Sequence, residues 1–574
     1  MQALPENPVI VQADRSVLLE VHGPRYEPAR DALALFAELV KSPEHIHTYR
    51  ITPLSLWNAA AAGLTADRII ESLGEYSKYP IPENILNEVR EWTGRYGRLQ
   101  LCQGPEGLEL ISSDEALILQ IQRHSRLAEY IARAIEPTRL LLRQGMRGRV
   151  KQALIKEIEF PVEDLAGYSE GDPLAFQLRQ ITRSGRLFAL RRYQRDAVDI
   201  FWAGGQSRGG SGVIVLPCGA GKTMVGMGIM ERIGQTAMVL STNITALRQW
   251  RDELLEKTTL SENQIGEYSG EAKDIRPVTL TTYQILTYRK TRKSPFVHLD
   301  LFHRRNWGLI IYDEVHLLPA PVFRAVAELQ AKRRLGLTAT LVREDGKEDD
   351  VFSLIGPKKY DVPWKDLERQ GWIAQAVCSE IRIALPEAER MRYAVADPKT
   401  KYRIASENPI KMQIIERLIE RHRDDNVLII GQYLDQLHQI AAQFGAPIIT
   451  GRTPNEERKR LYDHFKSGTI KRLIVSKVAN FAVDLPDANV AIQISGAFGS
   501  RQEEAQRLGR ILRPKREGVS AHFYSLVTRE TKEQEFARNR QTFLTEQGYR
   551  YAIVDDGLNS ANGSLSLSGD RSQA

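Results

Sequence analysis

The feature that most constrains the fold of this chain is a glycine-rich loop placed between a strand and a helix. The apolar, β-branched run Val213–Leu216 predicts a buried strand, and Met224–Ile233 predicts a helix. The segment that joins them reads LPCGAGKT and spans Leu216–Thr223. A strand, a glycine loop and a helix in this order form the unit that builds parallel, helix-covered sheets and that binds phosphate at its loop.

The residues of this loop suit a nucleotide phosphate. Three small residues would let the backbone curl so that its N–H groups and the helix N-terminus face the phosphate, namely Gly219, Ala220 and Gly221. Lys222 would bring a positive charge to the outer phosphates, and Thr223 would give its hydroxyl to Mg²⁺. A strict phosphate loop has Gly where this chain has Leu216, so an ordinary glycine-rich turn is the alternative interpretation.

A second motif, IIYDEVH at Ile310–His316, supplies two adjacent acids. Asp313 and Glu314 come at the end of an apolar strand predicted over Leu309–Tyr312. The carboxyl ends of the strands are where α/β sheets bind their ligands. Asp313 is therefore expected to hold the Mg²⁺ that Thr223 also contacts, and Glu314 to orient and deprotonate the attacking water. A solvated acidic turn is the alternative.

A third motif, QRLGRILR at Gln506–Arg513, carries Arg507, Arg510 and Arg513. The last two lie one helical turn apart on a single helix face. An arginine side chain is always charged and donates several hydrogen bonds, which suits the oxygens of a transferring phosphoryl group. We therefore expect arginine fingers here. A basic helix of this kind is otherwise a solvated or nucleic-acid-facing surface.

Strands and helices alternate in two series, the first from Gly185 onward and the second from near Lys411. The first series has strands predicted at Val213–Leu216, Ala237–Ser241, Val278–Thr281, Leu309–Tyr312 and Arg334–Leu337. The second has strands predicted at Asn426–Ile430, Pro447–Thr450, Arg472–Ser476, Val490–Ile494 and Ala521–Leu526. Such alternation predicts an α/β fold with two tandem doubly wound parallel sheets. Only the first series has a phosphate loop and only the second has the arginine motif, so one nucleotide bound between them explains both.

The segment before Gly185 differs in kind. Helices are predicted at Pro53–Gly63, Thr65–Leu73 and Pro82–Tyr96, followed by two short strands at Leu99–Cys102 and Leu108–Ile111. Three helices and a hairpin are the parts of a winged-helix module, which binds DNA. A protein-interaction or packing module of the same shape is an equal alternative.

Composition narrows the class of protein further. Lys and Arg number 79 against 72 Asp and Glu, a mild basic excess that is compatible with a polyanionic partner. The three cysteines are scattered and have no metal-ligand spacing, which argues against a zinc site or a disulfide framework. No long uncharged apolar run and no signal-peptide pattern is present, so a cytoplasmic protein without a membrane partner is expected.

These motifs resemble those of the superfamily 2 helicases, and within them the XPB family of DNA repair and transcription-opening translocases, in its bacterial form. The likeness covers Leu190–Tyr549. The segments that look like shared helicase motifs are Arg192, Tyr193 and Gln194 for adenine recognition, Ser241–Asn243 with Gln249 and Trp250 for motif Ia, Thr281–Gln284 for motif Ib, and Leu337–Thr340 (LTAT) for motif III.

Three further segments are similar to the XPB family in particular. The tripeptide Arg343, Glu344 and Asp345 follows LTAT and resembles the element that the family uses at the DNA fork; an ordinary charged turn is the alternative. The segment Ser476–Ser495 resembles motif V, with Asp484 at the acid that contacts the ribose. Residues 387–408, rich in Arg, Lys and Tyr, stand where the family has its DNA-gripping thumb, or else form a solvated helix pair.

The resemblance implies an ATP-dependent DNA helicase of 3′-to-5′ polarity with ATP and Mg²⁺ between two RecA-like domains. In that scheme Gln506 and His316 report the γ-phosphate, and Thr338 and Thr340 link it to domain motion. DNA, single-stranded or forked, would be held mainly through its phosphates, and a nuclease or other repair partner is possible but unidentified. An RNA helicase and an ATP-gated DNA clamp are the rival interpretations.

The expected domain organisation follows from these segments. We expect an N-terminal accessory domain over 1–145, a connector over 146–185 and the ATP-binding RecA-like domain over 186–376. The second RecA-like domain is expected over 377–556, with the thumb-like insertion inside it. The Gly- and Ser-rich tail, 557–574, is expected to be disordered.

Overall fold

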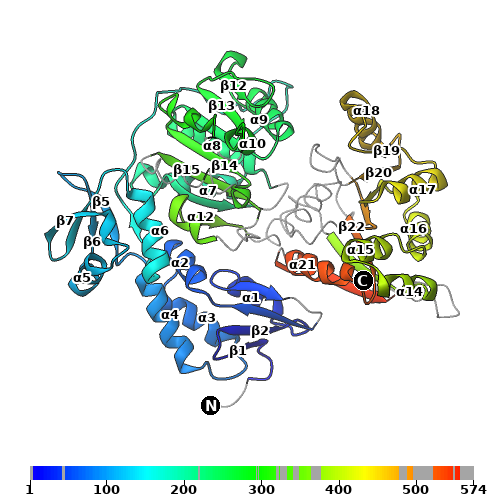
Figure 1. Cartoon of the computed structure of the whole chain (residues 1–574), viewed down its shortest axis with the longest axis horizontal. Coiled ribbons are helices and arrows are strands. Elements are labelled where there is room, and N and C mark those ends of the chain that lie inside the picture. The colour runs from blue at the N-terminus through cyan, green and yellow to red at the C-terminus, as the bar shows by residue number, and fades with distance from the viewer. Residues whose placement is uncertain are drawn as a thin grey trace. The chain divides into compact units, whose positions relative to one another are not determined.

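The computed structural model describes residues 4–41, 45–216, 220–291, 294, 296–318, 322, 332–339, 348–362, 376–476, 488–495, 521–546 and 550–555. The chain divides into two compact units (Figure 1). The first unit comprises Met1–Glu38, Tyr49–Pro217 and Gly221–Val362. The second comprises Leu39–Thr48, Cys218–Ala220 and Pro363–Ala574. The finer domain limits predicted from the sequence stay predictions.

The first unit is built on a seven-stranded parallel sheet with the order β12-β13-β11-β14-β15-β10-β16. Its strands are β10 Ser211–Val215, β11 Ala237–Ser241, β12 Ile265–Tyr268, β13 Val278–Thr282, β14 Leu309–Asp313, β15 Arg333–Thr338 and β16 Lys358–Asp361. Its helices are α7 Arg192–Trp202, α8 Lys222–Ile233, α9 Ile244–Lys257, α10 Tyr283–Leu286 and α12 Glu348–Leu354 (Figure 1). Strands β10, β11 and β13 are buried at every position, as expected for a sheet covered on both faces.

The second unit repeats this architecture. Its seven parallel strands have the order β19-β20-β18-β21-β22-β17-β23. They are β17 Ala376–Ile383, β18 Val427–Gly431, β19 Ile448–Ile449, β20 Arg472–Ser476, β21 Val490–Gln493, β22 Ala521–Thr528 and β23 Arg550–Asp555. When the strands of each unit are counted from one to seven along the chain, both sheets read 3-4-2-5-6-1-7. The predicted tandem α/β fold is therefore confirmed, and each strand of one unit has a counterpart in the other.

The helices of the second unit include a pair at the place of the predicted thumb-like insertion, whose role stays a prediction. They are α14 Glu387–Val395, α15 Pro398–Ser406, α16 Ile410–Arg421, α17 Leu434–Phe444, α18 Asn455–Lys466 and α21 Lys532–Glu546. Helices α14 and α15 are inserted between β17 and α16. The helix predicted at Arg501–Leu512 lies outside the described residues.

The N-terminal part contains more sheet than the sequence predicted. The expected helices are present as α2 Pro53–Ala61, α3 Ala66–Tyr76 and α4 Glu83–Arg95, and the hairpin as β5 Gln100–Gln103 and β6 Leu108–Ile111. A four-stranded sheet of order β1-β2-β4-β3 precedes them, formed by β1 Val9–Val11, β2 Ser16–Glu20, β3 Glu38–Lys41 and β4 Ile46–Arg50, with α1 Tyr26–Leu33. The hairpin belongs to a five-stranded sheet of order β7-β8-β6-β5-β9, with β7 Ile131–Glu136, β8 Arg139–Leu142, β9 Glu163–Asp164, α5 Glu115–Arg123 and α6 Arg147–Ile158.

An aromatic cluster fastens the N-terminal helices to the first sheet's helix α12. The Trp57 ring lies 6.0 Å from that of Trp92 and 6.1 Å from that of Phe352, and Tyr96 meets Phe352 edge-on at 6.4 Å. The side chain of Asn58 also accepts the backbone N–H of Lys358 over 2.9 Å. Such aromatic contacts add to the free energy gained by burial. The N-terminal helices and α12 are thus held together within the first unit.

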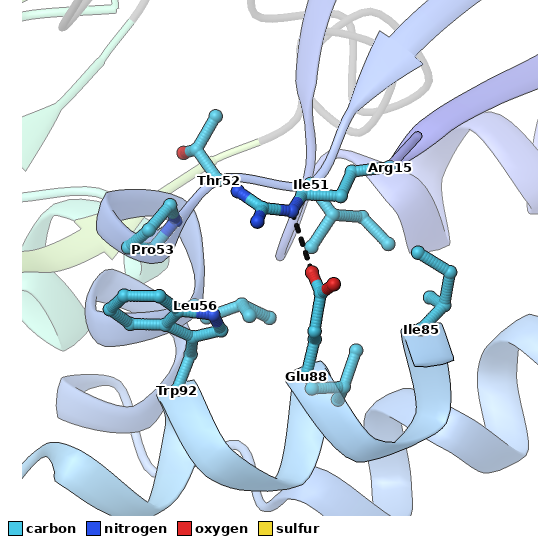
Figure 2. Close-up of a pocket in the computed structure, with 9 residues that line it drawn as sticks. Arg15, Ile51, Thr52, Pro53, Leu56, Ile85, Glu88 and Trp92 are labelled. Atoms are coloured by element: carbon cyan, nitrogen blue, oxygen red, sulfur yellow. Dashed lines mark ion pairs between the residues drawn. The ribbon is translucent and has the colours of Figure 1, made fainter. Parts of the chain in front are cut away.

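A small pocket opens between α2 and α4 (Figure 2). Arg15 reaches across it from the turn before β2, and its Nε lies 2.6 Å from Glu88 Oε2 on α4. Arg15 has a φ of 71°, a left-handed conformation that few non-glycine residues adopt. In the described part of the chain, no helix is both long enough and apolar enough to cross a membrane.

Candidate nucleotide site

The predicted phosphate loop ends where the sequence placed it. Helix α8 begins at Lys222, directly after Gly221, whose φ of +83° lies in the left-handed region. The left-handed conformation favours glycine here, and a Cβ on Gly221 would come within 2.5 Å of Gln194 Nε2, so the two residues lie close together. Ala220 is buried. Gly219, predicted to face the phosphate, lies outside the described residues.

Lys222 meets one of the two predicted acids directly. Its Nζ donates a hydrogen bond to Glu314 Oε1 over 2.7 Å, and both side chains are largely buried. Glu314 follows β14 with a φ of 52°, an unfavourable conformation for a residue with a Cβ. The turn of the chain at this residue is therefore held by its surroundings, and it places the carboxylate beside the ammonium group of the loop.

A buried histidine links this acid to strand β15. His316 Nδ1 shares a hydrogen bond of 2.6 Å with Thr338 Oγ1 and lies 3.6 Å from Glu314 Oε2. Thr338 is fully buried, and its carbonyl accepts the backbone N–H of Leu216 over 2.9 Å at the start of the loop. The four residues Lys222, Glu314, His316 and Thr338 thus form one connected group at the carboxyl ends of β10, β14 and β15.

Asp313, the last residue of β14, is held by two aromatic side chains. Trp250 on α9 donates its Nε1–H to Asp313 Oδ2 over 3.0 Å, and Tyr283 on α10 donates its hydroxyl to the Asp313 carbonyl over 2.8 Å. Burial raises the pKa of Asp313 to about 6, and the charge of Glu314 adds to this rise, whereas Lys222 and the Trp250 hydrogen bond oppose it. Burial makes the negative charge of this carboxylate unfavourable, and a bound cation would compensate that charge. Asp313 is therefore suited to bind a metal ion.

The predicted adenine motif lies beside the loop. Gln194, on the first turn of α7, is buried, and its Oε1 accepts the backbone N–H of Arg191 over 2.9 Å. Its proximity to Gly221 brings the motif and the loop together, while Arg192 is exposed. Thr223 is the second residue of α8 and is partly buried. Thr223 and Asp313 both have the hard oxygen ligands that Mg²⁺ prefers, so these residues fit such an ion.

The remaining predicted site residues have no described placement. They are Thr340, Arg343, Glu344, Asp345, Asp484, Gln506, Arg510 and Arg513. Conversely, two contacts with Asp313 were not anticipated, because Trp250 and Tyr283 belong to segments assigned only by resemblance to motifs Ia and Ib. The signal that could have found them is a large aromatic residue in each segment that follows a buried strand.

Comparison with known proteins finds helicase families along the chain. Residues 367–573 match the model of the ERCC3/RAD25/XPB C-terminal helicase, residues 187–343 that of the type III restriction enzyme res subunit, and residues 9–136 that of a helicase conserved C-terminal domain. The chain is 54% identical over 551 residues to proteins named DNA 3′-5′ helicase XPB from Kineococcus radiotolerans and Mycobacterium tuberculosis, covering 96% of this chain and 97% and 98% of theirs.

A eukaryotic relative is also similar along most of its length. It is the general transcription and DNA repair factor IIH helicase/translocase subunit XPB of Antonospora locustae, 35% identical over 572 residues, which cover 96% of this chain and 82% of that protein. The bacterial relatives are similar over nearly the whole chain, so the likeness includes the N-terminal part as well as both parallel sheets. This chain therefore belongs to the XPB family of helicases.

Proposed function

We propose that this chain is a DNA helicase or translocase that couples ATP hydrolysis to 3′-to-5′ movement along DNA, or to its unwinding, in DNA repair. The observation that carries the proposal is the connected group of Lys222, Glu314, His316 and Thr338. It joins the phosphate loop to a base and to the strand that leads into LTAT. The names of the two bacterial relatives support DNA as the substrate and 3′-to-5′ as the direction.

ATP binds at the carboxyl edge of the first sheet in this proposal. Lys222 binds the outer phosphates, Thr223 and Asp313 hold Mg²⁺, and Arg192 and Gln194 contact the adenine. The ion, when bound, neutralises negative charge on the phosphates. Trp250 keeps the Asp313 carboxylate oriented, since its indole N–H holds one of the two carboxylate oxygens.

Glu314 is the base that activates water. Its carboxylate is bound by the Lys222 ammonium, which is also the group that a phosphate at the loop requires. Phosphate therefore competes with Glu314 for Lys222, and binding of the nucleotide releases the carboxylate to accept a proton from water. ATP hydrolysis is thereby suppressed until the phosphate is correctly bound at the loop.

His316 and Thr338 transmit a change at the nucleotide site to strand β15. Because His316 contacts both Glu314 and Thr338, a shift of the base changes the hydrogen bond to strand β15. As the motifs imply, Arg510, Arg513 and Gln506 contact the phosphates in this proposal, Asp484 contacts the ribose, and Thr340 continues the link toward DNA. Arg343, Glu344 and Asp345 meet the DNA fork, and a nuclease or repair protein is the expected partner.

The decisive experiment compares ATP turnover and strand separation on several nucleic acids. We expect stimulation of ATPase by single-stranded or forked DNA, little stimulation by RNA, and displacement of a strand from a fork with a 3′ tail. Stimulation by RNA alone would establish the RNA-helicase alternative. Nucleotide-dependent DNA binding without movement in a translocation assay would instead establish the clamp. Glu314→Gln is the control that binds nucleotide without hydrolysing it.

A further inference from the structure

The shared strand order of the two units gives each residue of the phosphate loop an equivalent position in the second sheet. In the first unit α8 leads from the first strand, β10, to the second, β11, and Lys222 is its first residue. In the second unit α16 leads from the insertion after the first strand, β17, to the second, β18, and Lys411 is its second residue. Lys411 therefore occupies nearly the same position in its sheet as Lys222.

Lys411 also makes a contact equivalent to that of Lys222. Its side chain is fully buried, and its Nζ donates to the carbonyl of Ile494 over 2.8 Å. Ile494 is the first residue after the fifth strand, β21, just as Glu314 is the first residue after the fifth strand, β14. In each unit the lysine amine thus reaches the end of the same strand.

In the second unit the lysine also pairs with a carboxylate of the same chain. Both oxygens of Glu533, on α21, accept from Lys411 Nζ, over 2.8 and 2.9 Å. Oε1 also accepts the Ser406 hydroxyl of α15 over 3.1 Å, and Oε2 accepts the backbone N–H of Thr528 over 3.0 Å. Glu533 is itself 3% exposed. An ammonium and a backbone N–H are the donors with which a phosphate loop binds an oxyanion, and here the Ser406 hydroxyl adds a third donor.

We propose that the second unit contains an oxyanion site of the phosphate-loop kind, which the Glu533 carboxylate occupies as a built-in substitute for phosphate. A buried lysine requires a negative partner, because an uncompensated charge in the interior strongly destabilises the fold. In the first unit Lys222 pairs with Glu314, which gives way to a nucleotide phosphate in the proposed function, whereas the second unit keeps its carboxylate partner permanently. The same contacts tie α15 and α21 to the sheet without any nucleotide.

The proposal predicts that a small inorganic oxyanion can replace the missing carboxylate. In the full chain, Glu533→Ala removes the carboxylate and leaves Lys411, Ser406 and the Thr528 N–H. Its melting temperature in chloride should fall by roughly 10 °C. Inorganic phosphate or sulfate, at constant ionic strength, should raise it by at least about 3 °C more than in the wild type. Any anion binding at the loop of the first unit is common to both proteins and cancels in this difference.

The matched control is Lys411→Met/Glu533→Ala, which removes the cation as well and should show no extra response to phosphate. Lys411→Met/Glu533→Met, an apolar pair of similar size, should melt near the wild type and also lack the response. Recovery of folded Glu533→Ala only from phosphate or sulfate buffer would support the site. An equal effect of phosphate on Glu533→Ala and the wild type, or on Glu533→Ala and the double variant with Lys411→Met, would overturn it. None of these measurements depends on catalysis. Their outcome therefore tests the oxyanion site separately from the proposed helicase activity.

Discussion

Trp250 donates its indole N–H to the carboxylate of Asp313 across 3.0 Å, so a helix that follows strand β11 holds the acid that ends strand β14. The two residues are 63 positions apart in the chain. The segment around Trp250 resembles helicase motif Ia, whereas Asp313 is the proposed Mg²⁺ ligand. This hydrogen bond therefore connects the segment that resembles motif Ia to the proposed Mg²⁺ site.

Trp250→Phe should lower ATP turnover by roughly 10- to 100-fold, because a hydrogen bond to a charged group contributes about 1.5–3 kcal/mol. The matched control is Trp307→Phe. Trp307 is equally buried, and its indole N–H donates to the Leu301 carbonyl over 3.1 Å, away from the proposed site. The melting temperatures of the two variants should fall by similar amounts. Equal loss of ATPase in the two would show that packing, rather than the Asp313 hydrogen bond, is responsible.

Replacement of the loop lysine and of the base should have different effects. Lys222→Ala should weaken nucleotide binding, whereas Glu314→Gln should bind ATP at least as tightly as the wild type, because its neutral amide competes less well for Lys222. Turnover of Glu314→Gln should fall by on the order of a hundredfold or more. A fluorescent ATP analogue measures binding and phosphate release measures turnover. Normal turnover in Glu314→Gln would remove Glu314 from the role of base.

The contact between His316 and Thr338 should matter for coupling more than for binding. Thr338→Val keeps the side-chain shape and removes the hydroxyl that His316 contacts. Nucleotide affinity should stay within about twofold, while DNA-stimulated ATPase should fall by up to about tenfold, the effect of one neutral hydrogen bond. Thr279→Val is the control, since Thr279 is equally buried and bonds only locally, to Arg276 in the same unit. Unchanged stimulation in Thr338→Val would exclude this link.

The fold of the first unit should be sensitive to acid through Asp164. This carboxylate accepts from Arg147 Nη2 over 2.7 Å and from Lys151 Nζ over 2.8 Å, and these two cations hold the pKa of Asp164 well below its usual range. A group whose pKa is lower in the folded state stabilises the fold above its unfolded pKa of about 4. That stabilisation is lost as the pH falls below about 4 toward the lower folded pKa.

Asp164→Asn should therefore reduce the free energy of unfolding by about 3–5 kcal/mol at neutral pH, because Lys151 and Arg147 lose their partner. Its unfolding free energy should also change less than that of the wild type between pH 4 and the acid transition. Denaturant titrations across pH measure both effects. Asp252→Asn, at an exposed position, is the control and should behave as the wild type. Parallel acid profiles in Asp164→Asn and the wild type would contradict this account.

The central strands could be predicted because they are nearly continuous apolar runs. Strands β6, β11 and β20 have the predicted bounds, and the other predicted strands differ at their ends by one or two residues. Strand β16, with the sequence KKYD, gave no such signal because it lies at the sheet edge and is only partly buried. The strands of the N-terminal sheets are short and mix polar with apolar residues, so their pattern was equally weak.

The chemical identity of the nucleotide site could be predicted, but its internal contacts could not. Lys222, Asp313 and Glu314 occur in local patterns whose spacing follows from a loop and a strand end. The hydrogen bonds from Trp250 to Asp313 and from Lys411 to Glu533 join residues 63 and 122 positions apart. Such contacts depend on how helices fold back over the sheet, and a local pattern contains no record of that geometry.

The aromatic cluster around Phe352 has a mechanical consequence. Helix α12 begins at Glu348, three residues after Asp345, the last residue of the charged tripeptide that follows LTAT. The rings of Trp57, on α2, and of Tyr96, the residue after α4, contact the ring of Phe352. A force applied to the N-terminal part should therefore be transmitted to α12 through packed aromatic rings. A movement of the N-terminal part should therefore reach α12 directly, and α12 begins three residues along the chain from the segment expected to meet the fork.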